Sequence, residues 1–133
     1  MAAPFTLPIQ VVEAGRHTAW LVEDHTVPVV SLAWSWPGGA ARDPAGGEGT
    51  AAMAAAMLTE GAGDMPALAF ADALRDSAIQ LGFTAGRDSF EGSFRCLADA
   101  LPEALRLARL AMTAPRLDAE ALERVRARAV AAA

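Results

Sequence analysis

Residues 89–97 (SFEGSFRCL) constrain the fold of this chain most strongly, because small or apolar side chains alternate with polar ones from Ser89 to Cys96. Successive side chains of a β-strand point to opposite faces of a sheet. One set is apolar or small and the other is polar: Phe90, Gly92, Phe94 and Cys96 against Glu91, Ser93 and Arg95. The segment therefore predicts a half-buried strand, with a core on one face.

Three further runs read as strands. Residues 17–23 and 28–36 are rich in Val, Leu and Trp and are joined by a short linker, so they predict a β-hairpin or two adjacent antiparallel strands. Residues 83–86 are expected to pair with 89–97 across a tight turn. The second run carries an apolar face that we expect to be packed, formed by Val30, Leu32, Trp34 and Trp36.

Helical segments are predicted at 50–60, 66–81, 99–113 and 118–133. The first is rich in alanine, the best helix former, and Thr50 is its predicted N-cap. The order β-β-α-α-β-β-α-α predicts an α+β fold, with a largely antiparallel sheet and helices packed on one side. The expected core between sheet and helices contains Trp20, Leu32, Trp34, Phe83, Phe90 and Phe94.

The length of 133 residues allows one domain, and we treat residues 1–133 as a single domain. The chain stops at VRARAVAAA, inside a helical pattern that has no cap or breaker. We therefore expect a truncated, incomplete half-domain. An exposed sheet edge would favour pairing with another chain or a second copy.

The charge pattern argues against several classes of partner. The net charge is −5, and no Lys/Arg cluster stands apart from acidic neighbours, so nucleic-acid binding is not indicated. No stretch is apolar and long enough to insert into a membrane, and the start lacks the pattern of a signal peptide. The compartment stays open, with periplasm and cytoplasm both compatible.

Few residues could carry chemistry of their own. Cys96 lies in the alternating strand and reads as a small buried hydrophobe. His17 and His25 read as surface or turn histidines. They could pair with Cys96 or Glu60, but no spacing fixes such a geometry.

Two other sets of residues are equally weak candidates for catalysis. Ser31 and Ser35 lie in a strand without the G-x-S-x-G turn of a nucleophilic serine. Asp43 and Glu48 could act as paired carboxylates, although a solvated loop explains them as well. Their loop, residues 37–49 (PGGAARDPAGGEG), lacks the phosphate-binding glycine patterns.

The order and spacing of several short motifs carry more information than any single one. The glycine-rich loop is followed by a helix that opens at Gly49 and ends with Met57, Leu58 and Gly61. Later come the strand entry 81–88 (LGFTAGRD), the turn Pro115-Arg116-Leu117 and a helix that runs from Glu120 to Arg128. Together they resemble the N-terminal half-domain of the pitrilysin/insulinase family of zinc peptidases, over essentially the whole chain.

The resemblance fails where the family's chemistry lies. Active members carry the inverted zinc motif H-x-x-E-H on the helix after the loop. Matching Gly49 and Gly61 puts Ala52 and Ala56 at the two histidines and Ala55 at the catalytic glutamate. The third metal ligand would fall near Ala132 or Ala133. A methyl group has no lone pair for zinc and cannot accept a proton.

The resemblance therefore implies a pseudo-enzyme without a cofactor of its own, zinc being expected only in an active partner. Its expected function is an inactive zinc-peptidase-like subunit that assembles with an active zinc-motif partner and contributes to a peptide-binding chamber. A scaffold subunit of a larger assembly is the alternative; an enzyme of another class or an unrelated α+β domain remains open. The expected partner or peptide contacts are Gly38, Gly39, Gly46, Gly47 and Gly49.

Overall fold

The computed structural model describes residues 1–133 and has an α+β fold, in which every pair of neighbouring strands is antiparallel. The main sheet has three strands in the order β3-β7-β6. These strands are β3 (Val29–Pro37), β6 (Gln80–Ala85) and β7 (Ser89–Leu97). The predicted fold class and the central position of the alternating strand 89–97 are confirmed.

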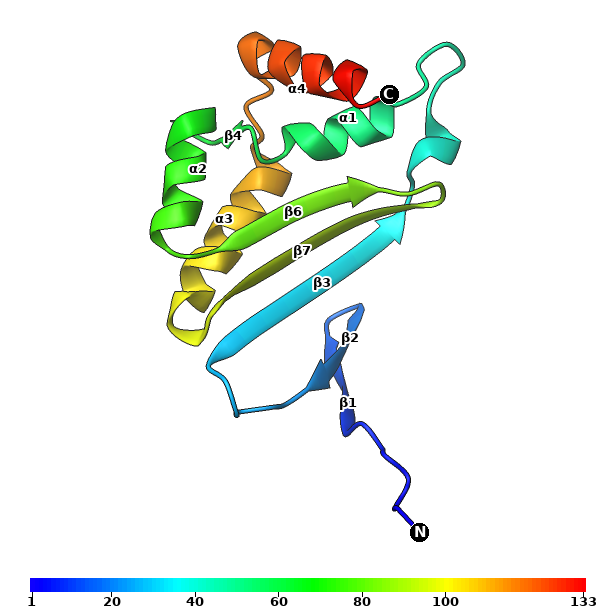
Figure 1. Ribbon diagram of the computed structural model, residues 1–133, viewed down its shortest axis with the longest axis vertical. Coiled ribbons are helices and arrows are strands. Elements are labelled where there is room, and N and C mark those ends of the chain that lie inside the picture. Colours follow the sequence, from blue (N-terminus) through cyan, green and yellow to red (C-terminus); the bar gives the residue numbers. More distant parts are fainter.

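All four helices lie on one side of this sheet (Figure 1). The helices α1 (Thr50–Met57), α2 (Ala67–Asp76) and α3 (Leu101–Thr113) contact its strands, and α4 (Ala119–Ala131) packs on α1. Short 3₁₀ turns at Ala40–Arg42 and Ala98–Ala100 precede α1 and α3, and a tiny ribbon of β4 (Gly61–Ala62) and β5 (Met65–Pro66) joins α1 to α2. None of the helices is long and apolar enough to cross a membrane.

The helix predicted at 66–81 ends earlier, at Asp76. Ala78 has a left-handed φ of 51°, which breaks the helical path, and the chain then enters β6 at Gln80. The apolar residues Ile79 and Leu81 fit the helical spacing, but they belong to the turn and the strand. Helical periodicity alone could not separate a helix end from a strand start over so few residues.

The predicted pairing of the first two strand runs is wrong. Strand β2 (His17–Val22) pairs with β1 (Ile9–Ala14), in a register that places Ile9 opposite Val22, and β3 pairs with β7. The sequence reading missed β1. Gly15 supplies the left-handed turn between β1 and β2, with a φ of 63°. The residues between β2 and β3 contain Pro28 and form no tight turn.

This hairpin extends away from the helices and the main sheet (Figure 1). Every residue of β1 and β2 is exposed, and Trp20 is 82% exposed. Trp20 is therefore not a core residue, contrary to the prediction. Leu32 is also wrong as a core residue, because it lies on the edge strand β3 and is 41% exposed. A two-stranded ribbon is only marginally stable by itself, so this hairpin is a candidate contact surface.

The core lies between β6, β7 and the first three helices. Its largest fully buried side chains are Phe70 of α2, Phe94 of β7 and Leu107 of α3. Phe83 is also buried, so the prediction holds for Phe83 and Phe94. Trp34 and Phe90 are partly buried and pack against the same cluster.

Gly92 allows the outer strand β3 to join this core. It lies between Trp34 on β3 and Phe83 on β6 in the strand register. A Cβ atom on Gly92 would lie 2.5 Å from the Trp34 indole carbons, so only glycine leaves room for that ring. The indole meets Phe83 and Phe94 edge-on, with ring centroids 6.0 and 6.2 Å apart.

Replacing Gly92 by alanine should displace the indole and lower the free energy of unfolding by about 1–3 kcal/mol, the usual cost of overpacking. Gly82→Ala is the matched control, because Gly82 lies on β6 in open space. Urea unfolding followed by tryptophan fluorescence measures both variants. Equal midpoints for the two would contradict this account of Gly92.

Candidate functional site

Helix α1 carries the positions that the sequence matched to a zinc motif. Ala52 and Ala56 are exposed, whereas Ala55 is buried in the core. The helix contacts β6, whose other side has no neighbouring strand. Helix α4 runs back along α1, so that the end of the chain lies beside the start of α1 (Figure 1). The exposed alanines thus lie near a free sheet edge and a second helix.

The N-terminus of α1 is held by a residue of the glycine-rich loop. Asp43 accepts hydrogen bonds from the backbone N–H groups of Gly49 (2.7 Å) and Ala51 (2.8 Å). These groups would otherwise have no partner at the helix start. Thr50, the predicted N-cap, is the first helical residue, and Gly49 occupies the N-cap position with a φ of 93°. Asp43, which precedes the helix by several residues, therefore caps α1 with its side chain.

The first residues of the same loop are hydrogen-bonded to the turn between β6 and β7. Gly38 N–H donates to the carbonyl oxygen of Asp88 at 3.0 Å, and Ala40 N–H donates to that of Gly86 at 2.9 Å. Gly39 is buried there with a φ of 81°, and a Cβ atom on it would lie 2.3 Å from the Gly86 oxygen. Of the other predicted contact glycines, Gly46 and Gly49 are exposed and Gly47 is half-buried.

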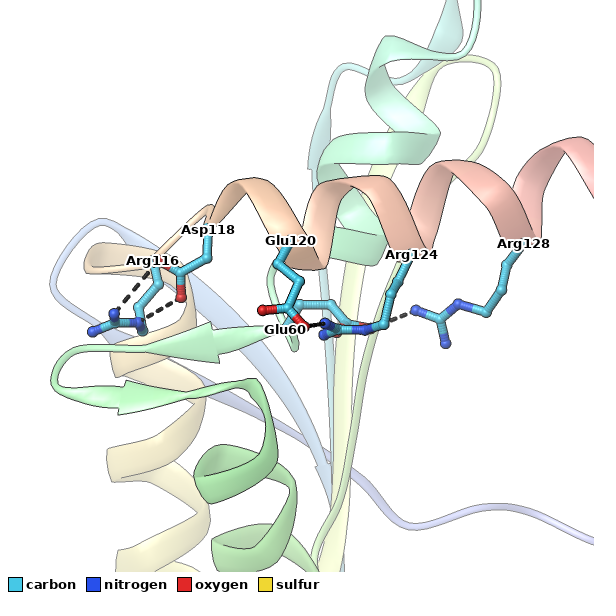
Figure 2. A network of polar contacts seen from close by, with 6 residues as sticks. All are labelled: Glu60, Arg116, Asp118, Glu120, Arg124 and Arg128. Carbon is cyan, nitrogen blue, oxygen red and sulfur yellow. Dashed lines mark hydrogen bonds and ion pairs between the residues drawn. The ribbon is translucent and has the colours of Figure 1, made fainter.

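A carboxylate after the end of α1 binds two arginines of α4 (Figure 2). Arg124 Nη2 donates to Glu60 Oε2 at 3.0 Å, and Arg128 Nη2 donates to the other oxygen. The Glu60 side chain is only 16% exposed. Because Arg124 and Arg128 are four residues apart, they lie on one face of the helix, and each donates a hydrogen bond to a different oxygen of the Glu60 carboxylate.

Two backbone hydrogen bonds also join the segment that follows α1 to the segment that precedes α4. Arg116 N–H donates to the Gly61 oxygen at 3.1 Å, and Gly63 N–H donates to the Ala114 oxygen at 2.8 Å. The Arg116 side chain pairs with Asp118 at the start of α4 (Figure 2). The exit from α1 and the entry to α4 are thereby tied together, which fixes how the two helices cross.

The candidates for other chemistry are not brought together. His17 and His25 lie on or beside the outlying hairpin, and His25 is near Glu23 at 3.7 Å. Cys96 is buried in the core, where loss of hydration raises the pKa of its thiol. No three His, Cys, Asp or Glu side chains gather into a group that could hold a metal ion.

The remaining candidates have ordinary structural roles. Ser31 and Ser35 are exposed on β3. Asp43 uses both carboxylate oxygens on backbone N–H groups, while Glu48 accepts from Gly46 N–H at 3.3 Å. Sequence reasoning missed the Glu60 pair with α4. The signal for it was the four-residue spacing of Arg124 and Arg128 opposite an acidic residue at the helix exit.

Solved structures match this arrangement over most of the chain. A peptidase M16 inactive domain from Pseudomonas fluorescens is 24% identical, with a TM-score of 0.81 over 95% of this chain. Pitrilysin is 25% identical, with a TM-score of 0.73 over 92%. A protease from Helicobacter pylori is 15% identical, with a TM-score of 0.74 over 92%. No family model matches the chain, and the search for curated relatives found none.

The chain therefore has the fold of M16 peptidase (pitrilysin) domains, one of which is described as inactive. The resemblance predicted from the sequence is confirmed as a structural match over most of the chain. This chain spans only 31%, 13% and 30% of the lengths of the three matched chains. The activity and partners of those whole proteins are consequently no finding about this chain.

Asp43→Ala should remove the cap of α1 and lower the free energy of unfolding by about 1 kcal/mol. Glu48→Ala removes an acidic side chain from the same loop without touching the helix N–H groups, so it should change stability much less. Thermal unfolding followed by circular dichroism compares the two. A larger loss for the Glu48 variant would refute the capping role of Asp43.

Glu60→Gln should weaken the contact of α4 with α1 by about 0.5–1 kcal/mol, a modest value because both arginines are largely exposed to water. Hydrogen exchange should speed up in the backbone amides of α4 and leave β7 unchanged. Glu123→Gln is the control, since Glu123 is exposed on the same helix and forms no ion pair. If both variants exchange alike, the Glu60 carboxylate does not hold α4.

Proposed function

We propose that this chain is a non-catalytic, M16 peptidase-like domain that assembles with an active zinc-motif partner and contributes to a peptide-binding chamber. The observation that carries the proposal is the placement of Ala52, Ala55 and Ala56 on α1 of an M16 fold. The H-x-x-E-H motif would occupy these positions in an active member. Alanine can neither ligate zinc nor act as a general base.

The structural supports of the helix are present although the reactive side chains are absent. Asp43 caps α1, and Glu60 ties its exit to α4. A domain used only as a wall of a chamber needs this scaffold and no metal. Zinc is accordingly assigned to the partner, and this chain binds no cofactor in the proposal.

The free edge of β6 offers a way to bind a peptide. An extended peptide can add to an exposed sheet edge through main-chain hydrogen bonds. The glycine-rich loop from Gly38 to Gly49 lies at the start of α1, which contacts β6. In the proposal, Gly46, Gly47 and Gly49 contact the partner or the peptide, while Gly38 and Gly39 hold the loop in shape.

The partner surface includes the exposed apolar hairpin and the edge strand β3. Strands β1 and β2 expose Ile9, Val11, Trp20 and Val22 on one shared face. Exposed contiguous apolar surface of this kind marks interaction sites. Self-association through the β3 edge is the form expected when no zinc-motif partner is present.

The decisive experiment measures zinc content and peptide cleavage for this chain alone and then with an M16 zinc-peptidase subunit from the same source. Light scattering records the size of each sample first. The chain alone should be free of stoichiometric zinc, inert and self-associated. Adding it to the partner should raise cleavage of a quenched fluorescent peptide.

A pair of alanine variants sharpens this test. Ala52→Glu places a charge on the exposed face of α1, whereas Ala71→Glu makes the same change on the exposed face of α2. Only Ala52→Glu should abolish the gain in cleavage, because Ala52 lies near the free edge of β6. Stoichiometric zinc or cleavage by the chain alone would refute the proposal, as would a clean monomer that leaves the partner's activity unchanged.

A further inference from the structure

Strand β3 forms one edge of the main sheet and pairs only with β7 (Figure 1). It is nine residues long and carries no charged side chain. Natural edge strands are usually short, charged or interrupted, because an unprotected edge pairs with another strand. The proline at the end of β3, Pro37, is its only protection of this kind. The rest of the edge is open to a further strand.

Two hydrogen bonds show which main-chain groups of β3 point away from β7. At the two ends of the ladder, the Ala98 N–H donates to the Pro28 oxygen at 2.9 Å and the Gly38 N–H donates to the Asp88 oxygen at 3.0 Å. Opposite residues of an antiparallel pair exchange such bonds at every second position. The even-numbered residues along β3 therefore bond to β7. The odd-numbered residues direct their N–H and C=O groups toward the free edge.

Three of these outward N–H groups are free to pair, and they belong to Ser31, Ala33 and Ser35. The N–H of Val29 already donates to the carbonyl oxygen two residues earlier, at 2.8 Å. Pro37 has no N–H. The open part of the edge is therefore short, and it is symmetric about Ala33.

This symmetry selects one way for β3 to pair with a second copy of itself. In an antiparallel pair with Ala33 opposite Ala33, Ser31 of each copy is opposite Ser35 of the other. All three residues then exchange hydrogen bonds in both directions. A shift of the register by two residues would oppose one of the serines to Val29 or Pro37, neither of which can donate in return.

The side chains also fit this register. Leu32 of one copy is then opposite Trp34 of the other, and Val30 is opposite Trp36, so that apolar side chains meet on the face that carries the helices. Leu32 is 41% exposed and Trp36 is 39% exposed in the single chain, so pairing removes apolar surface from water. The residues on the opposite face of β3 are small, and no like charges oppose each other.

The surface of the single chain is large enough to leave room for such an interface. The chain exposes 9515 Å² to water, whereas a compact monomer of 13.8 kDa exposes about 6,600 Å². The excess, about 2,900 Å², is larger than the roughly 800 Å² that each partner contributes to a standard protein–protein interface.

We propose that two copies of this chain pair through β3, antiparallel about a twofold axis at Ala33, and form one continuous sheet in the order β6-β7-β3-β3-β7-β6. The proposal rests on the proposed function, whose partner surface includes β3, and it names the second copy as the occupant of that edge when no zinc-motif subunit is bound. A zinc-motif subunit that uses the same edge then competes with the second copy.

Sedimentation velocity over a dilution series tests the dimer. The unsubstituted chain should sediment as a species of twice its mass at high concentration and dissociate on dilution. Ala33→Lys should raise the dissociation constant at least about tenfold, because two like charges would lie directly opposite each other. Ser93→Lys is the matched control. Ser93 is opposite Ala33 on β7 and is equally exposed, but it lies one strand inside the edge, so the dimer should persist.

Cysteine cross-linking under mild oxidation tests the register. Ala33→Cys should cross-link to its own copy, since opposite residues of a hydrogen-bonded pair have Cα atoms about 5.5 Å apart, within reach of a disulfide. Ser31→Cys should not cross-link to itself, because its copy lies roughly 14 Å away along the strand. A mixture of Ser31→Cys and Ser35→Cys should cross-link. The unsubstituted chain, whose Cys96 is buried, is the control.

A chain that stays monomeric at every concentration would overturn the proposal, as would a dimer that withstands Ala33→Lys. If that dimer is instead lost in Trp20→Glu, the contact belongs to the β1–β2 hairpin and not to β3. Cross-linking of Ser31→Cys to itself would overturn the register. The cleavage assay with the zinc-motif subunit separates the two proposals: a monomeric chain that raises cleavage overturns only the dimer, and a dimeric chain that never does overturns only the proposed function.

Discussion

The missing side chain at Gly92 is the constraint on which the sheet depends. Strand β7 is the only strand with a neighbour on each side, and Gly92 is the point where Trp34 of β3 and Phe83 of β6 meet across it. Because the helices cover β6 and β7, β3 has little apolar cover of its own. The Trp34 indole, lying over Gly92, connects β3 to the buried rings of Phe83 and Phe94.

The position of α1 is set from outside the helix. Its sequence is mostly alanine and methionine, so it has a high helix propensity but few side chains that would fix its orientation. Asp43 holds its start and the Glu60 pair with Arg124 and Arg128 holds its exit. None of these contacts uses the side chains at the exposed positions 52 and 56. The proposed loss of zinc ligands is therefore compatible with an intact fold.

The periodic spacing of apolar residues made most of the helices and strands predictable. The predictions failed where the structure depends on which strand pairs with which. Residues 89–96 alternate between polar and small or apolar side chains, and Phe94 and Cys96 are buried as that pattern requires. Trp20 belongs to an equally apolar run, but no local pattern reveals that its strand pairs with β1 and not with β3. In the candidate site, the match of Ala52, Ala55 and Ala56 to the zinc motif rests on glycine spacing and stays a prediction. The bonds of Asp43 and Glu60 join distant residues, which spacing along the chain does not encode.

The arginines of α4 show how one helix can stabilise the fold and still present an unused charge. Arg124 and Arg128 share one face of α4, and both form ion pairs with the carboxylate of Glu60, which is largely shielded from water. Arg126 is two residues from each, which turns it toward the opposite flank of α1. There it lines the same cleft as Glu48, Met53 and Leu122. Arg124 and Arg128 therefore hold α4 on α1, whereas the exposed Arg126 forms no ion pair and leaves that contact unchanged.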